Sequence, residues 1–168
     1  MILLDSKNWT SGSGIDVNFE SVEQKIVEHS QKNKKIFIGS DSFITRNQIC
    51  FASAVCLLTP SFGGRYYFYK ENVPLRRYST LATRITEEVR RSIEIAEYFM
   101  NSYDIPPDRL ELHLDVSPFA AKNGTSKLSD MLKGYVQGYG LTCKLSLMRG
   151  HLKASQIGTP NEIYSLRK

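Results

Sequence analysis

The chain has 168 residues, which is enough for one domain to bury a core without disulfide bonds. Its formal net charge of +5 favours an anionic partner, and no apolar run approaches the length of a membrane span. Cys50, Cys56 and Cys143 form no CxxC pair, which argues against a zinc site or a disulfide framework. The sequence shows no signal peptide, so we expect a cytoplasmic protein.

The first part of the chain is predicted to hold a loose lead-in followed by a helix. Residues 1–17 contain Ser11-Gly12-Ser13-Gly14, and we interpret them as a lead-in to a single domain of residues 18–168. Asn18 is a good N-cap for a helix that runs to about Lys32, with Val22 and Ile26 on its apolar stripe.

Three strands are predicted next, at 36–41, 49–58 and 65–70, and short turns between them indicate an antiparallel meander. Asp41 ends the first strand between Ser40 and Ser42. A carboxylate at the end of a strand lies where a ligand or a metal ion can reach it. The alternative is that Asp41 only caps a turn.

A long helix is predicted from a cap at Ser79 to about Tyr103. Glu88 falls within its apolar row, where an unpaired carboxylate costs several kcal/mol, of the order of 3–5, unless a cation neutralises it. Two interpretations remain open, a functional carboxylate or a salt bridge to Arg84 or Arg91, which are neighbours on the same helix.

The remaining predicted elements are a strand at 110–116, a helix from Ser126 to Tyr139 and a strand at 142–148. Asp115 again lies at the C-terminal end of a strand. His113 shares its side of that strand, but a lone histidine in a strand is more often structural.

The carboxylates are expected to converge because of the predicted topology. A strand that follows a helical crossover usually runs parallel to an earlier strand. If the strand at 110–116 pairs with the strand at 36–41, Asp41 and Asp115 lie side by side, and Glu88 faces them from the connecting helix. Such oxygen ligands suit magnesium or manganese.

At this point the sequence resembles the ribonuclease H-like YkuK family of bacteria, over roughly residues 36–155. The resemblance rests on Ile-Gly-Ser-Asp-Ser at 38–42, on Glu88-Val89 with the following Ser-Ile-Glu-Ile-Ala at 92–96, and on His-Leu-Asp-Val-Ser-Pro at 113–118. The segment Gly-Tyr-Val-Gln-Gly-Tyr-Gly at 134–140 and the pair Ala154-Ser155 extend it.

The resemblance implies an α/β fold of the ribonuclease H-like type, with a mixed five-stranded sheet and helices on both faces. In that sheet, three antiparallel strands are followed by parallel ones. It also implies that Asp41, Glu88 and Asp115 match the acidic positions of the metal site, with Mg²⁺ or Mn²⁺ as cofactor and two ions expected. Where relatives carry a further acidic residue, this chain has Thr159, so Glu162 replaces the fourth ligand or that ligand is absent.

These expectations favour a metal-dependent nuclease, a hydrolase acting on RNA, DNA or a hybrid, with no membrane partner. Asp41 would bridge the ions, Asp115 would bind them and Glu88 would complete the shell or orient the water. Backbone phosphates would contact Arg84, Lys127 and Lys153, and Arg76, Arg77 and Lys122 are further candidates. The alternative from another class is a non-catalytic nucleic-acid-binding module on the same fold. A nucleotide-binding domain is a weaker interpretation, because no glycine-rich phosphate loop is present.

Overall fold

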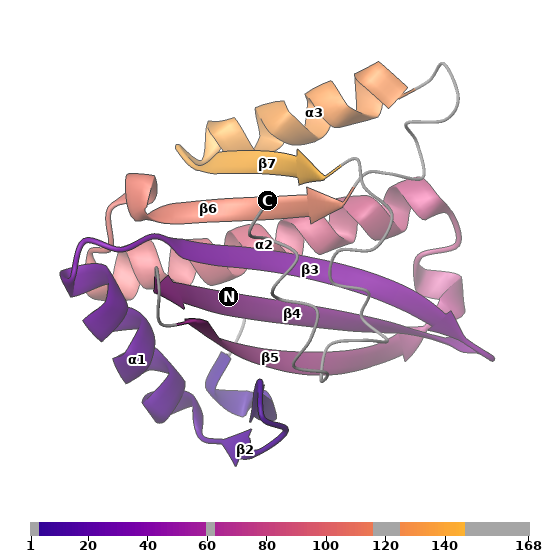
Figure 1. Cartoon of the computed structure of the whole chain (residues 1–168). Coiled ribbons are helices and arrows are strands. Elements are labelled where there is room, and N and C mark those ends of the chain that lie inside the picture. The colour runs from indigo at the N-terminus through magenta and orange to yellow at the C-terminus, as the bar shows by residue number, and fades with distance from the viewer. Residues whose placement is uncertain (1–3, 60–62, 116–124, 147–168) are drawn as a thin grey trace.

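A mixed seven-stranded sheet runs through the computed structural model, which describes residues 4–59, 63–115 and 125–146. The strand order is β2-β1-β5-β4-β3-β6-β7. The strands are β1 (Trp9–Ser11), β2 (Asp16–Val17), β3 (Ile36–Thr45), β4 (Gln48–Thr59), β5 (Gly63–Pro74), β6 (Leu110–Asp115) and β7 (Thr142–Ser146). Figure 1 shows β3, β6 and β7 running in the same direction across the sheet.

The pairing of the strands confirms the predicted topology but not the predicted strand count. Strands β3, β4 and β5 form the antiparallel meander, and β3, β6 and β7 pair in parallel. The prediction of five strands is wrong because the segment interpreted as a lead-in adds β1 and β2. These strands are too short to show a period of two, and β1 joins the sheet through pairs such as Thr10↔Phe68 on β5.

The α-helices begin at capping residues that the sequence supplies. They are α1 (Phe19–Gln31), α2 (Leu81–Tyr103) and α3 (Thr125–Gly138), with short 3-10 helices η1 (Leu4–Ser6), η2 (Leu75–Arg77) and η3 (Pro107–Arg109). The Asn18 side chain accepts a hydrogen bond from the Ser21 amide at 3.0 Å, as predicted. The cap of α2 is Thr80 instead of Ser79, and it forms a reciprocal capping box with Thr83.

All the described α-helices bury side chains in one core cluster. Helix α1 contributes Ile26, α2 contributes Ile93 and α3 contributes Leu132, and these residues join Ile38 of β3. A second cluster on the other face of the sheet takes its members from β3, β4 and β5. Within the part of the chain that the structure describes, the expectation of helices on both faces is therefore wrong.

Trp9 fixes the N-terminal segment to this core. Its ring is 1% exposed and lies 4.8 Å from the Tyr69 ring and 5.5 Å from the Phe19 ring. Its indole Nε1 donates a hydrogen bond to the Leu4 carbonyl at 2.9 Å. Trp9→Ala is expected to lower the free energy of unfolding by about 3–5 kcal/mol, because it leaves a large cavity.

Urea denaturation checks the Trp9 prediction. Ile15→Ala is the control, since Ile15 is 63% exposed and its truncation is expected to change the free energy of unfolding by less than about 0.5 kcal/mol. An equal midpoint for wild type and Trp9→Ala would show that the N-terminal strands contribute nothing to stability.

Candidate functional site

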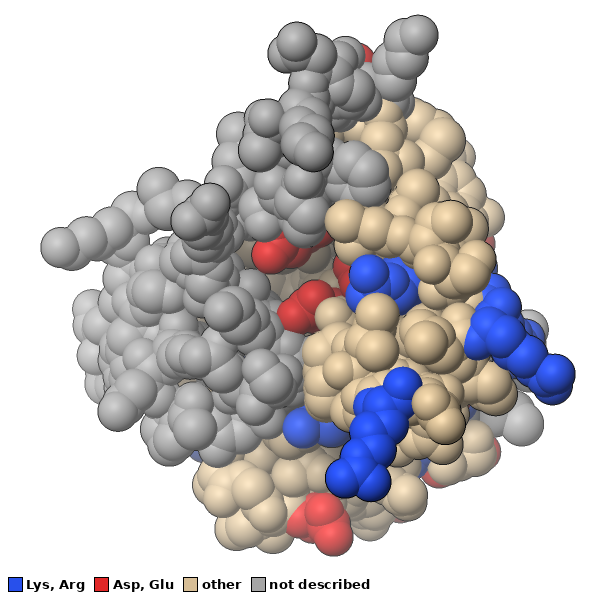
Figure 2. Space-filling model, turned by 90° about the vertical axis from the view of Figure 1, so that its right-hand side faces the viewer, with Lys and Arg blue, Asp and Glu red and all other residues tan. Residues whose placement is uncertain are grey.

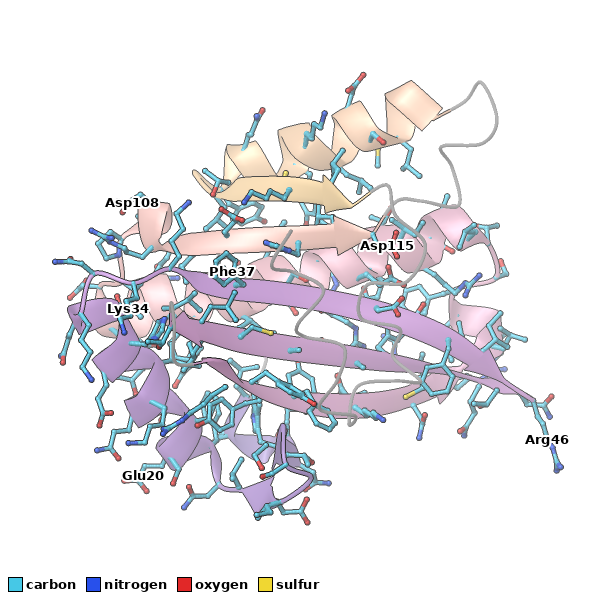
Figure 3. The ribbon with its side chains drawn as sticks, in the orientation of Figure 1. Glu20, Lys34, Phe37, Arg46, Asp108 and Asp115 are labelled. Carbon is cyan, nitrogen blue, oxygen red and sulfur yellow. The ribbon has the colours of Figure 1, made fainter. Side chains whose placement is uncertain are left out.

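Asp41 and Asp115 lie at matching positions of two adjacent parallel strands. The paired register ends with Gly39 of β3 opposite His113 of β6, and continuing it by two residues would bring Asp41 opposite Asp115. Both aspartates belong to the face of the sheet that carries Phe37 and His113, whose rings are 5.3 Å apart. Figure 3 shows Asp115 at the C-terminal end of β6. The predicted pairing of these two strands is thus confirmed.

Glu88 approaches this end of the sheet from α2, on the opposite face. Its side chain lies in a buried row of the helix, with the residue 7% exposed. The Ser42 hydroxyl donates a hydrogen bond of 2.6 Å to Glu88 Oε1. One turn along the helix, Ser92 Oγ donates to Ser40 Oγ at 3.1 Å. Serines on β3 therefore hold the helix row that carries Glu88 against the strand.

The three carboxylates are electrostatically coupled. Burial raises the pKa of Glu88 to about 8, and the negative charges of Asp41 and Asp115 push it in the same direction. The Ser42 hydrogen bond and the positive charge of Arg84 oppose this rise in pKa without cancelling it. A divalent cation among the carboxylates would favour the ionised form of Glu88 and so lower its pKa.

The interpretation that Glu88 forms a salt bridge with Arg91 is wrong. Arg91 Nε binds Glu87 Oε1 at 2.8 Å, and its guanidinium also pairs with Glu71 on β5. The guanidinium stacks over the Phe51 ring as well, 4.5 Å from its centroid. Arg91 is therefore a structural residue that joins α2 to the sheet, and Arg84 is the arginine whose charge acts on Glu88.

The chemistry of the acidic residues fits a hard divalent cation, since every donor is a carboxylate oxygen. Across residues 4–59, 63–115 and 125–146, no three His, Cys, Asp or Glu side chains are grouped closely enough to hold one ion. Thr159 and Glu162, the positions considered for a fourth ligand, lie outside the described residues. The described carboxylates therefore have the right chemistry for a divalent cation, but they do not form a preassembled three-ligand site.

Figure 2 looks onto the end of the sheet where the parallel strands finish, and it shows Asp and Glu side chains in a hollow there. Lys and Arg side chains lie beside this hollow in the same view. Of the predicted phosphate contacts, Arg84 is half-buried in the first turns of α2. The side chain of Lys127 and the whole of Lys153 lie outside the described part of the chain.

Two features near the site were missed by reasoning from the sequence. One is the contact of Ser42 with Glu88, because nothing in the sequence pairs a strand serine with a residue 46 positions away. The other is Glu111, which is 4% exposed on the aspartate face of β6. Burial favours a high pKa for Glu111, but hydrogen bonds from Lys144, Lys35 and His113 outweigh it and lower the pKa to about 2. His113 therefore binds the Glu111 carboxylate, with 3.0 Å between its Nε2 and Glu111 Oε1, which fits a structural role.

Comparison with known proteins agrees with this architecture. A family model described as ribonuclease H-like matches residues 18–146, which is more than half of the chain. The chain therefore belongs to the ribonuclease H-like family. No curated protein matches it, and no solved structure does. Membership of this family suggests a function connected with nucleic acid. None of the helices among the described residues is both long and apolar enough to cross a membrane.

Proposed function

We propose that this protein is a divalent-metal-dependent nuclease, a relative of the YkuK branch of the ribonuclease H-like family. The observation that carries the proposal is the alignment of Asp41 with Asp115 on parallel strands, with their charges acting on the buried Glu88. Carboxylates crowded in this way repel one another unless a cation compensates them. Family membership supports nucleic acid as the substrate class.

Each acidic residue has a proposed role. Asp41 and Asp115 would hold Mg²⁺ or Mn²⁺, and Glu88, which approaches from the other face of the sheet, would complete the ligand shell or orient the attacking water. A bound pair of such ions supplies an activated water and stabilises the leaving oxygen of the phosphodiester. Ser42 fixes the Glu88 carboxylate through its 2.6 Å hydrogen bond, and Arg84 offsets part of the negative charge.

A second candidate function is a nucleic-acid-binding module without catalytic activity. The lack of a preformed three-ligand group in the described residues favours it. Thr159, in place of an acidic residue, also favours it. This candidate predicts binding that weakens with salt, and no cleavage above background.

Metal dependence separates the two functions. RNA, DNA and RNA–DNA hybrid substrates are incubated with the protein in Mg²⁺ or Mn²⁺, and parallel reactions contain excess EDTA. We expect cleavage of at least one substrate with metal and a fall to background with EDTA, because the proposed mechanism needs the ions to activate the water and to stabilise the leaving oxygen. The readout is product length on a denaturing gel.

Two results would count against the nuclease proposal. Cleavage that persists in EDTA would contradict the metal mechanism. Salt-sensitive binding of a substrate without cleavage in either metal would favour the second candidate.

Since Cys50, Cys56 and Cys143 are free thiols, we also propose a cytoplasmic location, where cysteines stay reduced.

A further inference from the structure

The antiparallel part of the sheet extends past the acidic hollow. Strand β6 ends at Asp115, which aligns with Asp41, whereas β3 continues to Thr45 and pairs with β4 up to Gln48. Figure 1 shows β3 and β4 reaching beyond the ends of β6 and β7. We call this extension, residues 42–51 with the adjoining η2, the arm. Residues 44–48 at its tip are all exposed.

The arm carries basic residues and no acidic ones. Arg46 lies at the hairpin turn, and Figure 3 shows its side chain pointing away from the sheet. Residues 42–51 contain Arg46 and no Asp or Glu. Residues 72–86 contain Arg76, Arg77 and Arg84 and again no Asp or Glu. Basic residues in segments that contain no Asp or Glu are suited to bind an anion.

The arginines of η2 lie next to the hairpin because the backbone ties the two segments together. The Leu75 amide donates a hydrogen bond to the Asn47 carbonyl at 3.2 Å, and Pro74 pairs with Gln48. Arg76 and Arg77 are exposed. Arg46, Arg76 and Arg77 form no ion pair with any described residue, unlike Arg90 and Arg91 on α2, which pair with glutamates.

We propose that the arm binds the sugar–phosphate backbone of the nucleic acid and guides it toward the carboxylates. This inference rests on the proposed function for its partner, because family membership points to nucleic acid. Arg46, Arg76 and Arg77 contact phosphates away from the cleaved bond. The carboxylates repel the backbone unless cations compensate them, so the arm supplies attraction that the hollow lacks.

The length of the arm sets the length of nucleic acid that it contacts. Five residue steps separate Asp41 from Arg46, which at about 3.3 Å per residue amounts to ~16 Å. With a rise of about 3.4 Å per base pair, this corresponds to about five base pairs. Substrates that extend less than this distance beyond the cleaved bond are expected to lose the contribution of Arg46.

The test measures binding separately from cleavage. Fluorescein-labelled 20-mers, single-stranded and duplex, are titrated by anisotropy without divalent metal at several salt concentrations. The parent is Asp41→Asn, and the arm variant adds Arg46→Ala, Arg76→Ala and Arg77→Ala. A single-charge control, compared with Arg46→Ala alone on the same parent, adds Arg65→Ala instead, an exposed arginine near the start of β5, at the other end of that strand.

We expect the arm variant to bind at least about tenfold more weakly at low salt. The slope of log K against log salt is expected to fall in magnitude by about 2–3, since each lost phosphate contact removes ~0.9 on a duplex and ~0.7 on a single strand. The Arg65→Ala control is expected to stay within about twofold of the parent. Arg46→Glu alone, at a fully exposed turn, is expected to weaken binding without affecting the thermal midpoint.

The outcomes distinguish the arm from the nuclease proposal. An arm variant with unchanged affinity, salt slope and thermal midpoint would overturn the role of the arm, even if the wild type cleaves nucleic acid. An arm-dependent affinity in a wild type that cleaves nothing would support the arm and overturn the nuclease. A cleavage deficit that disappears on substrates that extend fewer than about five base pairs beyond the cleaved bond would support the proposed reach.

Discussion

Asp41→Asn is expected to lower the rate of metal-dependent cleavage by at least about 100-fold, while the protein stays folded. The change keeps the size of the side chain but removes the negative charge that a hard cation requires. Loss of groups that only orient metal ligands typically lowers activity 10–100-fold, so loss of a ligand itself is expected to exceed about 100-fold. Initial rates with Mg²⁺ and Mn²⁺ measure the effect.

The control for this variant is Asp108→Asn. Asp108 has a side chain that is 73% exposed, and it lies at the opposite end of the sheet from Asp115 (Figure 3). Its replacement is expected to change the rate by less than about twofold, as for a surface substitution away from the site. If Asp41→Asn retains the rate of wild type, the proposed mechanism is wrong.

Glu88→Gln is expected to stabilise the metal-free protein above neutral pH. The pKa of Glu88 is about 8 in the folded state, compared with 4.5 for the unperturbed group. Between these values the folded state binds the additional proton, so the stability of the wild type falls as the pH rises from about 4.5 to 8. The shift corresponds to roughly 4 kcal/mol at pH 8. Glutamine carries no charge and avoids this loss.

Urea denaturation at pH 5 and pH 8 in EDTA measures this effect. Glu87→Gln is the matched control on the same helix, because hydrogen bonds from Arg90 and the positive charge of Arg91 outweigh burial and lower the pKa of Glu87. A carboxyl whose pKa is lowered by folding stabilises the folded protein at every pH above its pKa in the unfolded chain. Glu87→Gln removes this contribution and is therefore expected to destabilise the protein at pH 8. A Glu88→Gln variant that is less stable than wild type at pH 8 would contradict the raised pKa of Glu88.

The fold was predictable from the sequence where periodicity was strong. The apolar row of α2 and the alternation in β6 gave these elements within a residue or two of their observed bounds. The parallel-crossover rule then predicted the parallel pairing of β3, which carries Asp41, with β6, which carries Asp115. Strands β1 and β2 were missed because two or three residues show no period. Strand β2 pairs only with β1, and β1 joins the sheet through β5, more than 50 positions away.

The site was predictable only in part, for the same reason. Burial of Glu88 followed from its position in the apolar row, and this prediction is confirmed. Its actual contact, Ser42, is set by the packing of α2 on β3, whereas local spacing pointed to Arg84 or Arg91. Arg91 instead binds Glu71, a long-range partner that i±3 and i±4 rules do not consider.

A crystal of the wild type soaked in Mn²⁺ and measured at the manganese absorption edge tests the central claim most directly. We expect an anomalous peak in contact with the carboxylates of Asp41 and Asp115, with Glu88 bound to the ion or to a water on it. The map would also show whether Glu162 reaches the ion. Saturating Mn²⁺ with no peak beside these carboxylates would contradict the account.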